Sequence, residues 1–522
     1  MNFSTTDIIV FIGYVVLIVA VGLWVSREKK GHKKNSEDYF LAGKALPWWA
    51  IGASLIASNI SAEQFIGMSG SGFALGLGIA SYEWMAALTL IIVAKCFLPI
   101  FIEKGIFTLP QFLELRYDSR IRTILAIFWV FLYTFVNLTT VLYLSSLALS
   151  VVLGISIIQS IIGLALVAIT YSIYGGLKAV AWTDVIQVFF LVFGGLITTY
   201  LALDAVSDGN GVLKGLKVLA EVAPEKFDMI LSKDNPFYKD LPGISVLVGG
   251  LWIANISYWG CNQYIIQRAL AAKNIKEAQK GLVFAGYLKL FIPLIVVIPG
   301  IAAYVLQADI GRYDEAYPWL LNNLVPVGIK GLAFAALIAA ALSSLSSMMN
   351  STATIFTVDV YKPFLNKKAS ETKLVMVGRI VGLSSMLIAV LAAQPLLGSQ
   401  DQIYQFIQKY TGYVSPGIVV LFLFGLFWKK ATGTAALWTA LASVPFSILI
   451  DILFPKMPFL DQMGIVFLLL SVLMILVSLI EGNQESPRAI KFSAGLFKTE
   501  PVFNILSAGI ILILGVLYAM FW

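Results

Sequence analysis

The amino-acid sequence predicts an all-α polytopic membrane protein with about fourteen transmembrane helices. Hydrophobic residues make up 59% of the chain and charged residues only 12%, whereas soluble domains contain about 45–50% and about 25%. Apolar stretches of roughly 20 residues, which suffice to cross a hydrocarbon core of about 30 Å, recur along the whole chain. Two of these stretches are interrupted by polar residues, a pattern that is typical of secondary transporters.

The apolar stretches define the expected spans in chain order. We place them at 8–25, 47–72, 79–102, 123–152, 157–174, 181–204, 243–266, 281–306, 331–358, 374–394, 403–428, 432–453, 459–480 and 502–522. The first span follows Asp7 rather than a basic region and has no small-residue cleavage pattern. We therefore expect it to be a retained anchor and not a signal peptide.

Basic residues indicate how the spans are oriented, because Lys and Arg are retained in cytoplasmic loops. A basic cluster follows the first span, namely Arg27, Lys29, Lys30, Lys33, Lys34 and Lys44. This bias predicts a multi-pass protein of the cell (inner) membrane with both termini extracytoplasmic. The net charge of +7 then follows from topology, so no nucleic-acid partner is expected. Cys96 and Cys261 lie in apolar segments, so we expect neither a disulfide nor a transition-metal site.

The span at 47–72 reads PWWAIGASLIASNISAEQFIGMSGSG and is broken by SNISAEQ. A membrane segment that stops being helical at mid-depth is tolerated only where it is buried in protein or lines a watery cavity. Unwound backbone beside half-helix ends can hold a small cation and a polar solute. The segment from Ala57 to Met68 is therefore a candidate binding site. Polar bonding between helices and close packing at glycines are the alternative reading.

Two acidic residues lie at the starts of later spans. Glu83 follows Tyr82, and a carboxylate there is costly unless it is paired or solvated. Anchoring of this segment at the membrane interface is the alternative. Asp184 follows a Gly-Gly pair, and by position alone we expect it to cap the helix that it begins.

A second interrupted span lies at 243–266, about five crossings after the first. Its polar interruptions are Asn255, Ser257, Tyr258, Gly260, Asn262 and Gln263. This spacing fits a five-plus-five inverted repeat whose two broken helices face each other. Lys289 lies well inside the next span, where a cation indicates a functional site more readily than it indicates snorkelling.

Hydroxyl groups gather on the span at 331–358, where Ser343, Ser344, Ser346 and Ser347 interrupt a run of Ala, Leu and Met. Residues three or four apart share a helix face, and weakly charged oxygen ligands suit a monovalent cation. Hydrogen bonding of these serines to their own helix is the alternative. Tyr404 and Gln408 are spaced i and i+4, so an aromatic ring and an amide face the same way.

Several segments together resemble the solute:sodium symporter family, and among its members the sodium/sugar symporters. They are SEDYFLAGK, NISAEQFIGMSGSG, YEWM, GLKAVAWTDVIQVFF, WGCNQYIIQR, NSTATIF and YTGYVSPG. The resemblance covers nearly the whole chain in order. It implies a LeuT-type inverted-repeat core at 47–428, with repeats at about 47–204 and 243–428. Residues 1–46 and 429–522 would be peripheral.

The resemblance also implies a function and its ligands. The protein would not be an enzyme but would import a hexose of the galactose or glucose type with sodium, by alternating access. The expected partners are the sugar, sodium and the lipid bilayer, with a homodimer as a candidate assembly. Carried over by motif, the sugar-binding residues would be Gln64, Glu83, Asn255, Lys289 and Gln408, with Asn59 nearby.

Gates and ion ligands follow from the same resemblance. Met68, Tyr82 and Tyr404 would form the outer gate and Tyr258 the inner one. Sodium would bind the carbonyl groups of Ala57, Ile60 and Ala340 and the hydroxyl groups of Ser343 and Ser344. A second sodium, or an exit route for the first, would use Asp184, Ser346 and Ser347.

Two departures from the sugar-transporting members leave the solute open. Ala86 replaces a serine that touches sugar, and Ser257 replaces a tyrosine beside the gate. One lost hydroxyl contact changes the preference among hexoses by about 0.5–1.5 kcal/mol. Inositol, sialic acid or an amino acid remain alternative solutes, since Lys289 could hold an anion. A non-transporting sugar sensor or a membrane enzyme on the same scaffold is a further alternative. We expect neither, because the sequence shows no appended soluble domain, no paired metal-ligand His/Cys motif and no nucleophile constellation.

Overall fold

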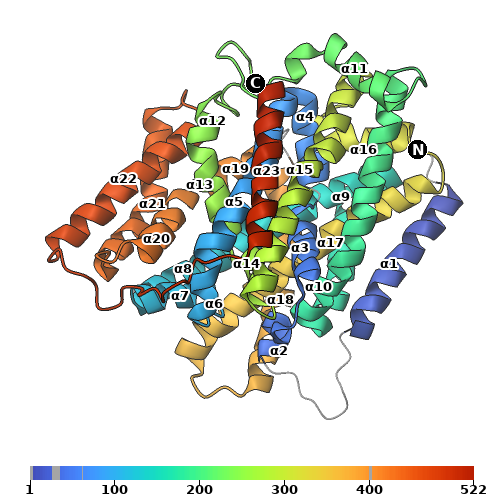
Figure 1. The fold of residues 1–522 in the computed structure, drawn as a ribbon. Helices are drawn as coiled ribbons and strands as arrows, with labels where there is room; N and C mark the ends of the chain where they lie inside the picture. The colour runs from blue at the N-terminus through green and yellow to red at the C-terminus, as the bar shows by residue number, and fades with distance from the viewer. Residues whose placement is uncertain (1–3, 26–35, 62, 399–402) are drawn as a thin grey trace.

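Long apolar segments fold as helices in this protein, because backbone in hydrocarbon must satisfy its own N–H and C=O groups. The structure is a computed structural model that describes residues 4–25, 36–61, 63–398 and 403–522. Within these ranges every element is a helix (Figure 1), which confirms the predicted all-α fold. Of the basic cluster after the first span, only Lys44 lies within the described residues.

The helices follow the apolar stretches in order. The first half contains α1 (Thr5–Val25), α2 (Ser36–Leu41), α3 (Trp48–Asn59), α4 (Ser69–Leu75), α5 (Ser81–Ile92), α6 (Leu98–Glu103), α7 (Leu109–Arg116), α8 (Ser119–Leu132), α9 (Thr139–Leu153), α10 (Ile157–Val206) and α11 (Val212–Val222). The second half contains α12 (Ser245–Val248), α13 (Gly250–Gly260), α14 (Gln263–Leu270), α15 (Ile275–Val305), α16 (Ala316–Asn323), α17 (Ile329–Ile355), α18 (Glu371–Leu397), α19 (Ile403–Gly412), α20 (Ser415–Phe427), α21 (Gly433–Leu453), α22 (Phe459–Ile480) and α23 (Pro501–Met520).

Short segments of other helix types extend or connect these helices. The 3-10 segments are η1 (Ala42–Lys44), η3 (Leu77–Ala80), η6 (Pro224–Lys226) and η7 (Tyr313–Glu315). The π-helical segments are η2 (Glu63–Met68), η4 (Val93–Phe97), η5 (Tyr133–Leu138) and η8 (Phe356–Leu365). Because π-helical turns inside helices often mark functional sites, η2 and η5 are of particular interest here.

The number of crossings stays a prediction. Among the described residues, ten helical segments are long and apolar enough to cross a membrane. Two further apolar helices, Ile157–Thr170 and Ser415–Phe427, are shorter. The two interrupted spans are also divided into pieces below the length of a crossing, so length and composition alone do not establish fourteen.

The first predicted break is confirmed. Helix α3 ends at Asn59, and Ile60 adopts an extended conformation with φ −78° and ψ 90°. The chain becomes helical again in η2 and continues into α4. The polar run SNISAEQ therefore marks the point where this span loses its helical winding.

The second break also exists, but it is narrower than the sequence predicts. Asn255, Ser257 and Tyr258 lie inside the regular helix α13, and the interruption is confined to Cys261 and Asn262. The hydroxyl of Tyr133, in η5, accepts a hydrogen bond from the N–H of Gln263 at 2.8 Å. A side chain from another helix thus satisfies backbone that the break releases.

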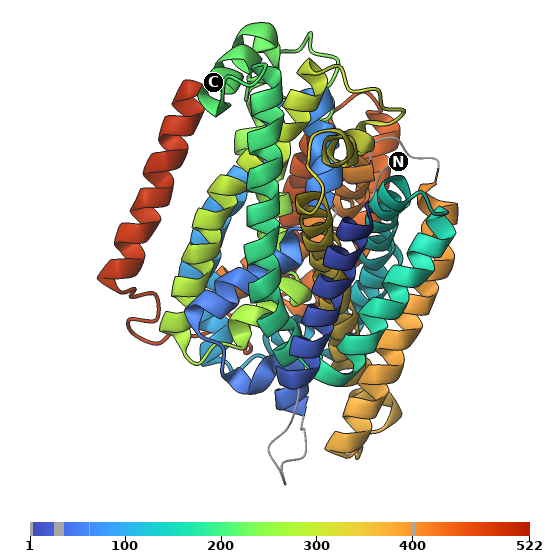
Figure 2. The ribbon, with the colours of Figure 1, turned by 90° about the vertical axis from the view of Figure 1, so that its right-hand side faces the viewer.

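Two other spans differ from prediction. The span expected at 403–428 is divided into α19 and α20 by a turn at Tyr413 and Val414. The spans expected at 157–174 and 181–204 are instead joined in the helical segment α10 of 50 residues. A straight helix of that length would extend about 75 Å, and Figure 2 shows its teal first half and green second half running in opposite directions.

Helix α17 forms the centre of the bundle and α1 its periphery. The most apolar part of the α17 span is 94% buried, compared with 17% for α1. Asp7 in α1 accepts hydrogen bonds from the N–H groups of Gly328 and Gly331, at 2.7 and 2.9 Å. Asp7 therefore caps the start of the central helix.

Small residues let α15 approach the two halves of the first broken span, as is usual between membrane helices. A Cβ atom on Gly52 of α3 would lie 2.8 Å from the carbonyl oxygen of Gly281. One on Gly300 would lie 2.1 Å from the carbonyl oxygen of Ser69, the first residue of α4. This close packing holds both sides of the break in fixed positions relative to α15.

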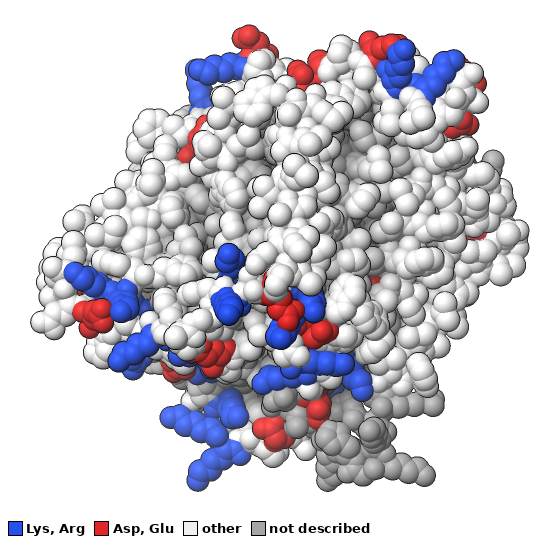
Figure 3. All heavy atoms as spheres, viewed as in Figure 1, with Lys and Arg blue, Asp and Glu red and all other residues white. Residues whose placement is uncertain are grey.

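Charged residues gather near the two ends of the molecule, and a broad band between them is almost free of charge on the face seen in Figure 3. This distribution fits a multi-pass membrane protein. Figures 1 and 2 place both ends of the described chain at the same end of the bundle, as an even number of crossings requires. The side of the membrane on which they lie stays a prediction.

Candidate functional site

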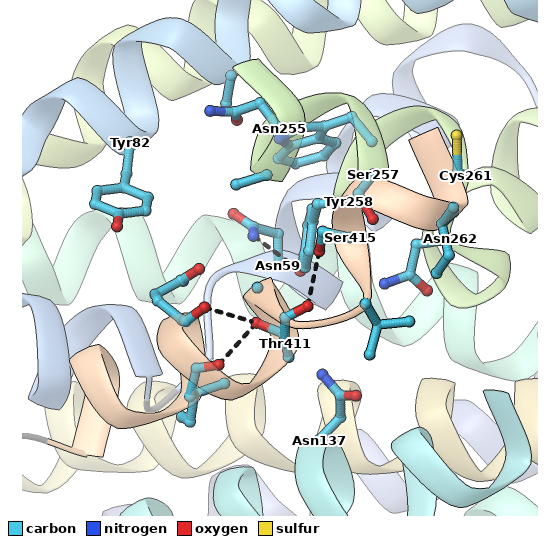
Figure 4. A pocket seen from close by; sticks show the side chains of 18 of the residues that line it. Asn59, Tyr82, Asn137, Asn255, Ser257, Tyr258, Cys261, Asn262, Thr411 and Ser415 are labelled. Atoms are coloured by element: carbon cyan, nitrogen blue, oxygen red, sulfur yellow. Dashed lines mark hydrogen bonds between the residues drawn. The ribbon is translucent and has the colours of Figure 1, made fainter. Parts of the chain in front are cut away.

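Residues from the broken helices line a partly enclosed cavity. The lining comes from α3, η2, α5, α13, α15 and α19, with contributions from α8, η5, α20 and α22 (Figure 4). Among the lining residues are nine that the sequence predicts as substrate or gate residues: Asn59, Gln64, Tyr82, Glu83, Asn255, Tyr258, Lys289, Tyr404 and Gln408.

A buried ion pair lies in the wall of this cavity. The ammonium group of Lys289 donates hydrogen bonds to a carboxylate oxygen of Glu83 and to the side-chain oxygen of Asn59. Lys289 and Glu83 are 0% and 3% exposed, and the Lys289 nitrogen lies 5.1 Å from the ring centroid of Trp259. Because each charge is paired with the other, this wall presents polar atoms without a net charge. The alternative that Glu83 only anchors the segment at the interface is therefore wrong.

Asn59 connects this ion pair to a pair of tyrosines. Its amide nitrogen donates to the hydroxyl oxygen of Tyr258 at 3.0 Å, and the hydroxyl of Tyr264 donates to the same oxygen at 2.6 Å. The ring of Tyr258 is thus held from two sides. Asn59 is located where the regular winding of α3 ends, so the helix break itself positions this hydrogen bond.

The amides in the cavity are oriented by nearby backbone. The side-chain oxygen of Gln64 accepts a hydrogen bond from the N–H of Ser61 at 3.1 Å, across the first break. Its amide nitrogen remains as a donor. The amide nitrogen of Asn255 donates to the carbonyl of Leu251 at 3.1 Å, so its oxygen remains as an acceptor. The site therefore presents both hydrogen-bond donors and hydrogen-bond acceptors.

Two of the three predicted outer-gate residues meet. The rings of Tyr82 and Tyr404 pack edge to face with their centroids 5.7 Å apart. Such pairs contribute about 0.5–1.5 kcal/mol beyond the area that they bury, so the contact can form and break readily. Met68 is buried in η2 but is not among the lining residues.

A second polar cluster lies at the meeting of α3, α10, α14 and α17. Asp184 and Arg268, both 0% exposed, form an ion pair at 3.5 Å. Asp184 also accepts hydrogen bonds from the hydroxyl groups of Ser54, at 2.5 Å, and Ser343. Because Asp184 lies inside α10 and pairs with a buried cation, the expectation that it caps a helix start is wrong.

The predicted sodium ligands lie on two adjoining segments. Ser344 of α17 donates to the carbonyl oxygen of Ser58 at 3.0 Å and so joins α17 to the last turn of α3. A hydroxyl that donates its proton still has lone pairs with which to bind a cation. Ala57, Ile60 and Ala340 belong to the same segments and are buried. These oxygens are chemically suited to sodium.

The remaining serines bond within their own helix. Ser346 donates to the carbonyl of Leu342, and Ser347 to that of Ser343, both at 2.7 Å. The hydroxyl of Ser347 also accepts a hydrogen bond from the guanidinium group of Arg268. A cation at Ser347 would therefore lie beside an arginine.

Sequence reasoning overlooked Arg268, Tyr264 and Tyr133. Arg268 follows an apolar span directly, and a buried arginine there could have been recognised as costly unless paired. No comparable signal distinguishes the two tyrosines, since Tyr is common in membrane segments. Their roles depend on which helices meet.

Comparisons with known proteins agree with this arrangement. A model of the sodium:solute symporter family matches residues 39–443. The sodium/glucose cotransporter of Vibrio parahaemolyticus is 55% identical, covering 99% of this chain and 98% of the relative. The human sodium/myo-inositol cotransporter 2 is 35% identical, over 83% of this chain and 67% of its own length.

The fold is also found among solved structures. A Na⁺-coupled sialic acid symporter, in a substrate-bound outward-open state with a novel Na⁺ site, superposes with a TM-score of 0.80 and 25% identity. The match covers 92% of this chain and 98% of that structure. Like that protein, this chain has the LeuT-type architecture with discontinuous helices that its sequence predicts. The family match and the 55% identical relative together show that the chain belongs to the sodium:solute symporter family.

Proposed function

We propose that the protein couples sodium entry to the import of a neutral hexose of the galactose or glucose type. The observation that carries the proposal is the buried pair of Glu83 and Lys289, which neutralise each other in the cavity wall. A sialic acid or amino acid carries a carboxylate, which would need a cation free to bind it. Sugar hydroxyls instead both donate and accept, and therefore match a wall of amides with a compensated ion pair.

The relatives support a neutral, hydroxylated solute. The relative at 55% identity is named a sodium/glucose cotransporter. The human relative at 35% is named for myo-inositol, which is also uncharged and rich in hydroxyl groups. Inositol is therefore the second candidate solute, whereas a sensor without transport has no support from these names.

We assign the sugar to Gln64, Glu83, Asn255, Lys289 and Gln408, with Asn59 behind them. In this assignment Tyr82 and Tyr404 close one side of the solute, and Tyr258 the other. Ala86 and Ser257 also line the cavity. The hydroxyl that Ala86 lacks is either replaced by water or its loss changes the preference among hexoses.

Sodium couples to the solute through the first break in this proposal. The ion would bind the carbonyl groups of Ala57, Ile60 and Ala340 with the hydroxyl groups of Ser343 and Ser344. It would tie α17 to the end of α3, where Asn59 begins the sugar site. A bound ion would thus stabilise the arrangement that the sugar requires, and the sugar would favour ion binding by the same free energy.

A second ion at Asp184, Ser346 and Ser347 would have to displace the guanidinium group of Arg268 from Asp184 and Ser347. One ion is sufficient on energetic grounds. A potential of 100 mV contributes roughly 2.3 kcal/mol per charge, and a tenfold sodium gradient about 1.4 kcal/mol. Together they sustain a sugar gradient of roughly several hundredfold. We further propose that the protein lies in the inner membrane with extracytoplasmic termini.

Uptake into proteoliposomes tests the function. Labelled D-galactose, D-glucose and myo-inositol are offered with an inward sodium gradient and, separately, with potassium in its place. We expect sodium-dependent uptake of a hexose, and uptake of none of the three would overturn the proposal. Gln64→Ala should abolish uptake, because it removes a donor from the cavity. The matched control is Gln279→Ala, since Gln279 is also buried but bonds to the carbonyl of Ala94 away from the cavity.

A further inference from the structure

The cavity extends beyond the residues assigned to the sugar. Further polar side chains line it: Asn137, Asn262, Thr411 and Ser415. Figure 4 shows Tyr82 at one end of the cavity and Asn262 and Asn137 toward the other, with Asn59 and Tyr258 between them. Asn137, Asn262, Thr411 and Ser415 together form a second polar wall, and none of them is among the residues assigned to the sugar.

Asn137 carries an unsatisfied acceptor in this wall. The residue lies in the π-helical segment η5 and is only 7% exposed. Its side-chain oxygen is buried and has no hydrogen-bond partner among the described residues. A buried acceptor without a partner costs about 1–3 kcal/mol, so the site favours a group that can donate a hydrogen bond.

Asn262 supplies a complementary donor. The hydroxyl oxygen of Tyr133 accepts from the N–H of Gln263 at 2.8 Å, so its proton is available to donate elsewhere. It donates to the side-chain oxygen of Asn262. This bond fixes the orientation of the Asn262 amide and leaves its nitrogen, with two protons, as the remaining donor group in the cavity wall.

The two hydroxyl groups add further acceptors. Thr411 donates its proton to the carbonyl of Ile407 at 2.7 Å, and Ser415 donates to the carbonyl of Thr411 at 2.9 Å. Both oxygens keep lone pairs. The wall therefore offers a fixed donor among several acceptors, a combination that suits the neighbouring hydroxyl groups of a sugar, each of which donates and accepts.

We propose that Asn137, Asn262, Thr411 and Ser415 form a second subsite for sugar hydroxyls, separated from the first site by Tyr258. The solute reaches it when the Tyr258 ring moves, which requires breaking the hydrogen bonds from Asn59 and Tyr264. This subsite rests on the proposed function, because it takes the same hexose during transport. Its role is to hold the departing sugar, so it affects turnover rather than binding at the first site.

The experiment compares binding and turnover in Asn137→Ala. Sodium-dependent binding of D-galactose or D-glucose, whichever the wild type transports, is measured in detergent, and the initial rate of uptake is measured in proteoliposomes. We expect the dissociation constant to change less than about threefold and the maximal rate to fall about tenfold, as the loss of one hydrogen bond near 1.4 kcal/mol implies. Asn137→Leu, which keeps a similar volume, should behave in the same way.

Asn350→Ala is the matched control. Asn350 is also 7% exposed, and both atoms of its amide lack partners among the described residues, but it does not line the cavity. Asn350→Ala should leave the ratio of the maximal uptake rate to the binding affinity for the sugar unchanged. Thermal melting checks that each variant is folded. Should Asn137→Ala fail to fold, Asn137→Leu provides the same comparison.

Three outcomes would overturn the subsite. They are a wild-type rate in the folded Asn137 variants, a loss of binding as large as that of Gln64→Ala, and an equal loss of rate in the Asn350 control. The proposed function fails by a different result, namely the absence of sodium-dependent hexose uptake by the wild type. The two proposals can therefore be refuted separately.

Discussion

Replacing Lys289 by Met tests whether the cavity wall contains a neutral pair of charges. The substitution removes the ammonium group and leaves the Glu83 carboxylate, 3% exposed, without its cation. Breaking a buried pair by removing one partner destabilises proteins by about 3–5 kcal/mol, because an uncompensated charge stays buried. We therefore expect a loss of about 3 kcal/mol in the free energy of unfolding and no sugar uptake.

The double variant Glu83→Gln with Lys289→Met separates stability from function. It contains no buried charge at this position, and replacing an entire buried pair by neutral groups is often neutral or stabilising. Stability should return to near the wild-type value while uptake stays absent, since the sugar contacts are still lost. Denaturant unfolding in detergent gives the stabilities, and proteoliposome uptake gives the activity. A single variant as stable as the wild type would refute the buried pair, and a transporting double variant would refute its role in binding.

Three further predictions concern the ion site, helix packing and pH. Ser343→Ala should raise the sodium concentration needed for half-maximal uptake at least tenfold, because the proposed ion site loses one coordinating oxygen. An unchanged sodium dependence would refute the proposed ion site. Gly300→Ala places a Cβ atom 2.1 Å from the carbonyl oxygen of Ser69 and should lower the free energy of unfolding by about 1–3 kcal/mol. Gly163 has open space around it, so Gly163→Ala should not destabilise the protein. Equal melting temperatures for the two variants would contradict this packing. Burial raises the pKa of the Asp240 carboxyl above its usual 3.8. The contribution of Asp240 to the stability of the folded protein is therefore fully present below pH 3.8 and is lost as the pH rises through the raised pKa. The wild type should therefore lose more stability than Asp240→Asn over that range in detergent melting curves, and parallel curves would argue against a raised pKa.

The sequence predicted the fold class and most of the site because local rules apply strongly in a membrane. The run SNISAEQ cannot continue an apolar span at low cost, and the structure ends α3 inside that run at Asn59. Glu83 and Lys289 can each be recognised from the sequence as a charge inside an apolar span, where a charge is costly and indicates a functional site. Their positions could be predicted from one-dimensional patterns because each departs from what hydrocarbon permits.

The partner of each buried polar group could not be predicted in the same way. The sequence neighbours of Asp184 predict a helix cap, because they give no indication of Arg268, which lies 84 positions later. The polar run from Asn255 to Tyr258 predicts an unwound segment, yet α13 stays regular there, and Asn255, Ser257 and Tyr258 line the cavity. Helical hydrogen bonding tolerates polar side chains when neighbouring helices provide partners.

By itself, therefore, the sequence determined that the chain is a bundle of membrane helices with two interrupted spans, because hydrophobicity and backbone hydrogen bonding in hydrocarbon depend on neighbours along the chain. Only the tertiary structure decided which charges pair with each other, which tyrosine bonds to the second break and which amide oxygen in the cavity wall has no partner among the described residues. Those facts depend on the approach of α3, α5, α13, α15 and α17 to within hydrogen-bond distance. The energy of a buried polar atom is set by the partner that packing brings to it, and no local pattern specifies that partner.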